Sequence, residues 1–119
     1  LTPWEKIISR LEAASIGDMM IVIYNPKSKG RPKHLERARE VILKHYGPQT
    51  PVGLVRNAKR GAEEVIVTNL GDMLEYNIDM LTTVIIGNSE TKIINEKIIT
   101  PRGYQKKDKY EQVLGGAND

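Results

Sequence analysis

A continuous apolar run, MMIVIY at residues 19–24, constrains the fold of this 119-residue chain more than any other stretch. The run is rich in branched side chains, which is typical of a central strand covered on both faces. A helical pattern at residues 31–47 and a strand pattern at residues 50–57 follow it. A strand, a helix and a strand of these lengths normally cross over right-handed between parallel neighbours. We therefore expect an α/β domain whose first two strands are parallel.

An amphipathic helix is expected before the first strand. Thr2 and Glu5 match a capping box, and Pro3 fits the first helical turn. The helix is expected to reach about Ser15, and Gly17 ends it. Its apolar residues recur at helical spacing, at Ile7, Ile8, Leu11 and Ala14.

The second predicted helix ends at Gly47 and has one apolar stripe. The stripe consists of Leu35, Ala38, Ile42 and Tyr46. The charged side carries Arg37, Arg39 and Lys44, which we interpret as solvated. The histidines, His34 and His45, are also interpreted as solvated helix residues, because no carboxylate–histidine pattern for a metal accompanies them.

The second half of the chain predicts further strands. A strand at residues 63–70 follows the second strand so closely that only an antiparallel hairpin is possible. A short helix at residues 70–78, a strand at 80–89 and a small hairpin turning at Asn95 and Glu96 are expected next. These elements predict a mixed, mostly five-stranded sheet flanked by helices, in one domain over residues 1–104. Residues 105–119 are polar, and we expect a tail with a frayed helix or disorder there.

Composition narrows the classes of protein. The chain has no cysteine, which excludes disulfide frameworks, thiolate metal sites and cysteine nucleophiles. No apolar run approaches the roughly 20 residues that cross a bilayer, and the start resembles no signal peptide, so a soluble cytoplasmic protein is expected. The net charge of +3 suits acidic small molecules or nucleic acid and decides neither. Aromatic residues are only 5%, which counts against a nucleic-acid surface.

Polar residues close the first two strands. In a sheet with parallel strands, ligands bind beyond the carboxyl ends, because free backbone groups and side chains converge there. The candidate residues are Tyr24, Asn25 and Pro26 after the first strand, and Arg56, Asn57 and Ala58 after the second. The stretch GNSET at residues 87–91 shares this edge if its strand is parallel too. Asn, Pro, Gly and Ser are also ordinary turn residues, so a purely structural interpretation stays open.

A basic loop follows the first strand. Its cations are Lys27, Lys29, Arg31 and Lys33. They could bind phosphates or carboxylates through charge-assisted hydrogen bonds, and a solvated loop is an equal alternative. The Gly-rich phosphate motifs G-x-x-x-x-G-K-[ST] and G-x-G-x-x-G are absent.

Several stretches together resemble one family in order and spacing across residues 1–104. They are LTPWEKI, VIYNPKSKGR, TPVGLVRNAKRG, VIVTNLGDM, DMLTTVIIGNSET and ITPRGY. They resemble the precorrin-3B C17-methyltransferases, also called cobalt-factor III methyltransferases, which are tetrapyrrole methylases of vitamin B12 biosynthesis. Members of this family have two α/β domains, and the chain resembles the C-terminal one. The resemblance therefore implies a missing N-terminal domain, a homodimer, and a chain that is inactive alone.

The resemblance also implies a site. In the family, S-adenosylmethionine lies between the two domains, and a tetrapyrrole occupies a neighbouring trough. The donor-facing residues implied here are Tyr24, Asn25, Pro26, Arg56, Asn57, Ala58, Leu81, Thr82 and Thr83, the last three through main-chain groups near the adenine. The implied partners of substrate carboxylates are Lys27, Lys29, Arg31 and Arg60, with Arg56 as a further candidate. No metal ligand and no catalytic acid or base is identified.

Alternatives of other classes remain. Another tetrapyrrole methylase with a different ring position would share the architecture. A non-catalytic binding or dimerisation module would need no methyl donor.

Overall fold

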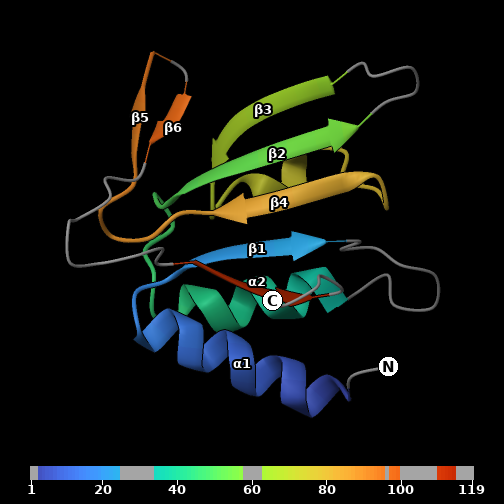
Figure 1. Cartoon of the computed structure of the whole chain (residues 1–119), viewed down its shortest axis with the longest axis vertical. Coiled ribbons are helices and arrows are strands. Elements are labelled where there is room, and N and C mark those ends of the chain that lie inside the picture. The colour runs from blue at the N-terminus through green and yellow to red at the C-terminus, as the bar shows by residue number, and fades with distance from the viewer. Residues whose placement is uncertain (1–2, 25–33, 58–62, 96, 100–109, 115–119) are drawn as a thin grey trace.

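The computed structural model describes residues 3–24, 34–57, 63–95, 97–99 and 110–114, the last of these by its backbone (Figure 1). Within these ranges, the helices are α1 (Trp4–Ile16), α2 (His34–Leu43) and the short 3-10 helix η2 (Met73–Glu75). The strands of the main sheet are β1 (Met20–Tyr24), β2 (Pro51–Asn57), β3 (Glu63–Asn69), β4 (Thr82–Ile86) and β7 (Tyr110–Leu114). A separate hairpin joins β5 (Lys92–Ile94) to β6 (Lys97–Ile99). This confirms the predicted mixed sheet with helices and the predicted hairpin.

The strand order in the described part of the main sheet is β3-β2-β4-β1-β7. Strand β4 is antiparallel to both β1 and β2, so β1 and β2 run in the same direction without being neighbours. The predicted direction is therefore right and the predicted adjacency is wrong. A crossover helix fixes the relative direction of two strands but leaves room for a later strand between them.

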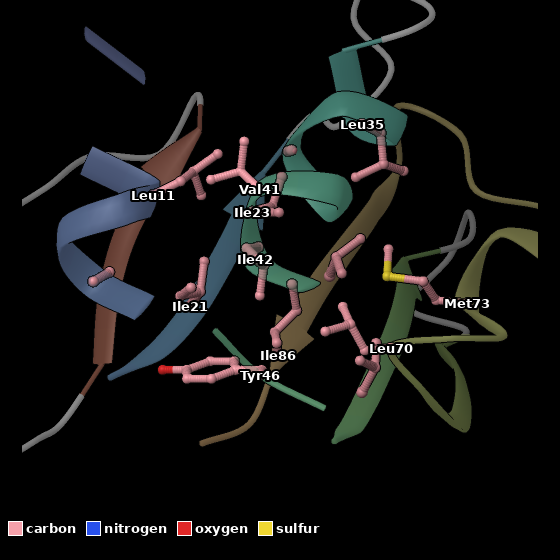
Figure 2. Packing of buried hydrophobic residues seen from close by; sticks show 14 of the residues in the cluster. Leu11, Ile21, Ile23, Leu35, Val41, Ile42, Tyr46, Leu70, Met73 and Ile86 are labelled. Carbon is pink, nitrogen blue, oxygen red and sulfur yellow. The ribbon is translucent and has the colours of Figure 1, made fainter. Parts of the chain in front are cut away.

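The core lies between the two helices and one face of the sheet (Figure 2). Alternate strand residues are fully buried there, for example Ile21, Ile23 and Ile86. The expected apolar stripe is buried: Leu35, Ala38 and Ile42 lie on α2, and Tyr46 lies in the turn that follows it. The expectation that β1 is covered on both faces is only partly right, because Val22 and Tyr24 on its other face are half-buried.

Helix α1 ends where it was predicted to end, but it begins one residue later than predicted. Pro3 is the N-cap residue of α1, one position after the predicted cap at Thr2. Thr2 lies outside the described residues, so its capping box with Glu5 stays a prediction. At the other end, the Gly17 amide donates to the Ala13 oxygen over 3.0 Å, which confirms the predicted C-terminal boundary.

Helix α2 stops earlier than expected. It ends at Leu43 rather than Gly47, and residues 44–46 continue as a turn. The Tyr46 hydroxyl donates to the Met19 oxygen at 2.5 Å, and burial raises the pKa of this phenol. Tyr46 thus joins the end of α2 to the start of β1.

Two other predictions need correction. The helix expected at residues 70–78 is reduced to η2, because the side chain of Arg39 holds the carbonyl oxygens of Leu70 and Gly71, at 2.8 and 2.7 Å. The frayed helix or disorder expected after Gln105 is wrong for Tyr110–Leu114, which forms β7 and pairs parallel with β1. An open strand edge can recruit a segment through main-chain hydrogen bonds, whatever the polarity of its side chains. The domain boundary at residue 104 stays a prediction.

Candidate functional site

The carboxyl ends of β1 and β2 and the start of β4 meet at one edge of the sheet (Figure 1). Because β4 runs opposite to both neighbours, its first residues lie between their last ones. Thr83 pairs with Tyr24 on one side and with Val55 on the other. We call this edge the β4-start edge, defined by Tyr24, Arg56, Asn57, Leu81, Thr82 and Thr83.

The β4-start edge brings together six of the nine residues predicted to bind the donor. Thr82 pairs with Arg56, and the amide of Asn57 donates to the Leu81 oxygen over 3.2 Å. The other three predicted donor residues, Asn25, Pro26 and Ala58, lie outside the described residues. The four predicted substrate residues, Lys27, Lys29, Arg31 and Arg60, lie outside them as well.

The six residues differ in what they can offer a ligand. Leu81 is 49% exposed and Asn57 is also exposed, whereas Tyr24 and Thr83 are half-buried. Thr82 is buried, and its hydroxyl is bonded within the chain. Both Leu81 and Thr82 donate their main-chain N–H to Asp79. The N–H groups of Leu81 and Thr82 are therefore already used within the chain, whereas Leu81 keeps its exposed side chain and the second lone pair of its oxygen for a ligand.

Asp79 lies beside this edge, and the sequence analysis did not single it out. Its carboxylate accepts from the Leu81 amide at 2.9 Å and from the Thr82 hydroxyl at 3.1 Å through Oδ1. Its Oδ2 accepts from Arg56 Nε at 2.9 Å. The hydrogen bond from Arg56 is the largest of the effects that lower the pKa of Asp79. The Asp-x-x-Thr spacing before a strand is a signal that could have indicated this loop.

The GNSET stretch lies at the opposite edge, because β4 is antiparallel and ends there. Ser89 donates its amide and its hydroxyl to the carboxylate of Asp18, at 2.9 and 2.5 Å. Asp18 has a φ of 58°, in the left-handed region. The condition under which GNSET would share the β4-start edge is therefore not met, and the stretch instead ties the end of β4 to the turn before β1.

Other polar residues of the sequence analysis have internal partners. Arg39 is not solvated as predicted, because it binds two carbonyl oxygens. His45 lies 2.9 Å from Glu12, and His34 stacks on Trp4 with 3.9 Å between ring centroids. Among the described residues, no three His, Asp or Glu side chains are grouped so that they could hold a metal ion. None of the helices formed by these residues has the length and apolar character needed to cross a membrane.

Curated relatives match most of the chain. It is 52% identical over 107 residues to the cobalt-factor III methyltransferase of Priestia megaterium, covering 90% of this chain and 20% of that protein. It is 46% identical over 104 residues to the probable cobalt-factor III C(17)-methyltransferase of Salmonella typhimurium, covering 87% and 43%. The protein of the same name from Methanocaldococcus jannaschii is 47% identical over 119 residues, covering 93% and 47%. The chain spans less than half the length of each of these relatives.

A solved structure supports the same comparison. The crystal structure of the methyltransferase CobJ matches with a TM-score of 0.73 and 28% identity, covering 84% of this chain and 42% of that one. No family model matches the chain. The chain thus shares its α/β fold with part of the methyltransferase CobJ. More particularly, the chain is homologous over most of its length to the cobalt-factor III C17-methyltransferases, which confirms the resemblance of its motifs.

Proposed function

We propose that the chain is the C-terminal half of an S-adenosylmethionine-dependent methyltransferase. Its reaction is methylation of C17 of precorrin-3B or cobalt-factor III, with ring contraction, in cobalamin biosynthesis. The observation that carries the proposal is the convergence of the ends of β1 and β2 with the start of β4, in a chain 46% identical to a protein named a probable cobalt-factor III C(17)-methyltransferase. An N-terminal half, which the longer relatives have room for, completes the site.

The residues of the β4-start edge fit a donor that carries an adenine ring. Leu81 presents an exposed aliphatic side chain, and Asn57 beside it presents an exposed amide. An apolar surface next to a group that both donates and accepts hydrogen bonds suits a flat heterocycle with polar edges. Tyr24 and Thr83 are paired on the face away from the core, where their hydroxyls extend the polar part of the edge.

The chain's own contribution to the reaction is alignment. S-adenosylmethionine supplies a methyl group that its sulfonium already activates. The edge residues hold the donor in one orientation toward the ring carbon and exclude water, which lowers the entropic part of the barrier. Asp79 is bonded to Arg56 and to the backbone, so it is a structural group here rather than a proton acceptor.

The remaining predicted residues complete the proposal. Asn25, Pro26 and Ala58 continue the donor loops beyond β1 and β2. The cations of the basic loops, Lys27, Lys29, Arg31 and Arg60, pair with the acetate and propionate groups of the tetrapyrrole, through charge-assisted hydrogen bonds. The protein is a cytoplasmic homodimer, which fractionation and light scattering test.

A chimeric enzyme tests the function. This chain replaces the matching 104 residues of the Salmonella typhimurium relative, and transfer of a labelled methyl group to cobalt-factor III is measured beside the unaltered relative. We expect transfer, with the new methyl group on C17 by NMR and mass spectrometry. A product methylated at another ring position would contradict the C17 assignment and favour another tetrapyrrole methylase. A folded chimera that neither binds the donor nor transfers methyl would contradict the proposal altogether.

The isolated 119-residue chain provides a second test. We expect a folded protein with no measurable methyl transfer and only weak binding of S-adenosylmethionine in titration calorimetry. Robust turnover by this chain alone would refute the half-site assignment.

A further inference from the structure

The carboxylate of Asp79 connects the end of β2 to the segment that enters β4. Its two oxygens accept hydrogen bonds from three groups: Leu81 N at 2.9 Å, Thr82 Oγ1 at 3.1 Å and Arg56 Nε at 2.9 Å. These groups belong to two elements that are distant in the chain and adjacent in the sheet. One side chain therefore sets the position of both.

Main-chain hydrogen bonds also hold residues 79–82. Thr82 N donates to the Asp79 oxygen over 3.0 Å, and Asp79 N donates to Thr82 Oγ1 over 3.2 Å. The Leu81 oxygen accepts from the amide of Asn57. Residues 79–82 are thus held by reciprocal bonds that all involve Asp79 or the last residue of β2, although Leu81 itself is exposed.

Arg56 bonds to one of two neighbouring carboxylates. In the pairing of β2 with β3, Glu64 lies directly opposite Arg56 and is exposed. The guanidinium nevertheless bonds to Asp79, which approaches from the start of β4. Because Nε is occupied in this way, Arg56 is anchored to the sheet edge and is not a free partner for a ligand carboxylate on that side.

We propose that Asp79 is a positioning residue of the donor site, which orders Leu81 and anchors Arg56 so that the β4-start edge has one conformation before the donor binds. The inference rests on the proposed function, because it names what prepares that site. Preorganisation of this kind improves affinity by removing the ordering cost at the moment of binding. Asp79 acts through its neighbours and touches neither donor nor substrate.

Two substitutions separate its two tasks. Asp79→Ala removes the acceptors for both Leu81 and Arg56. Asp79→Asn keeps an oxygen for the Leu81 amide, but its NH2 group cannot accept from Arg56. Glu64→Gln is the matched control, since it removes a neighbouring carboxylate that holds neither group.

Amide hydrogen exchange of the 119-residue chain tests the ordering. In Asp79→Ala we expect the Leu81 amide to exchange about tenfold faster, because its acceptor is gone. Asp79→Asn and Glu64→Gln should leave this amide close to the unsubstituted rate. An unchanged Leu81 rate in Asp79→Ala would overturn the proposal.

Steady-state kinetics of the chimeric enzyme described above test the link to the donor. We expect Asp79→Ala to raise KM for S-adenosylmethionine about tenfold, equivalent to about 1.4 kcal/mol, with kcat within about twofold. Asp79→Asn should raise KM less, and Glu64→Gln should not raise it. A fall in kcat with KM unchanged would overturn the proposal. If the unsubstituted chimera transfers no methyl group, the proposed function is rejected, and with it the role of Asp79 in a donor site. The exchange rates then still decide whether Asp79 orders residues 79–82.

Discussion

Arg39 provides the most stringent test of the packing, because sequence reasoning placed it on the solvated side of α2. Its Nε donates to the Leu70 oxygen at 2.8 Å and its Nη2 to the Gly71 oxygen at 2.7 Å. Leu70 is fully buried. Arg39→Ala therefore removes both donors from a turn where water has limited access to the carbonyl groups.

The expected loss of unfolding free energy can be worked out from these two hydrogen bonds. Hydrogen bonds from charged groups contribute about 1.5–3 kcal/mol each, and the half-exposed position of Arg39 argues for the lower end. After allowance for partial replacement by water, we expect Arg39→Ala to lower the free energy of unfolding by about 2 kcal/mol. In a domain of this size that corresponds to a fall in Tm of about 8 °C.

The assay is urea unfolding of the 119-residue chain followed by far-ultraviolet circular dichroism. Arg37→Ala is the matched control, because Arg37 lies on the same helix and is exposed. We expect the control to change the free energy of unfolding by no more than about 0.5 kcal/mol. Equal effects of the two substitutions would show that the Arg39 bonds to the η2 turn contribute nothing, and would refute the reasoning.

Three further predictions concern other contacts. A Cβ at Gly87 would lie 2.6 Å from side-chain atoms of Thr91, so Gly87→Ala should cost about 1–3 kcal/mol in urea unfolding, whereas Gly47→Ala, with open space around it, should be nearly neutral. Tyr46→Phe removes the hydroxyl that donates to a main-chain oxygen just before β1 and should lower stability by about 1 kcal/mol, measured by thermal unfolding. The lowered pKa of Asp79 means that its carboxylate stabilises the fold fully above its ordinary pKa of about 3.9, and that this contribution is lost as pH falls through the lower folded value. Asp79→Asn should therefore melt below the unsubstituted chain at neutral pH and converge with it in acid; parallel curves at all pH values would contradict this.

The local sequence pattern was sufficient to predict the helices and strands that bury an apolar face. The stripe of α2 depends on side-chain periodicity alone, and Leu35 and Ile42 are buried as that periodicity requires. The apolar run of β1 predicted a strand, and Ile21 and Ile23 on its core face are buried, whereas its other face is only half-buried. The hairpin at Asn95 was also predictable, because its turn and both strands are adjacent in the chain. Asn95 has a φ of 50°, which this residue type tolerates well.

Strand order and several polar contacts could not be predicted, because they depend on residues far apart in the sequence. Nothing local in β4 indicates that it lies between β1 and β2 and runs opposite to both, so the sequence left open at which end of the strands GNSET lies. The same limit applies to Arg39, whose partners are 31 and 32 residues away, and to the pair of Arg56 with Asp79. Six of the residues that the family resemblance implies for the donor nevertheless lie together at the β4-start edge, because β1 and β2 run in the same direction, as predicted, and β4 starts where they end.

The central position of β4 also determines when this sheet can assemble. Until residues 82–86 are available, β1 shares no hydrogen bonds with the β2–β3 pair, since β4 is the strand that pairs with both. Closing the sheet brings together segments about sixty residues apart, such as Tyr24 and Thr83, and such non-local pairing slows folding. During synthesis, β1 and β2 therefore each present an unpaired edge while β4 is still to come, and the β4-start edge becomes complete in the same step that joins the two parts of the sheet.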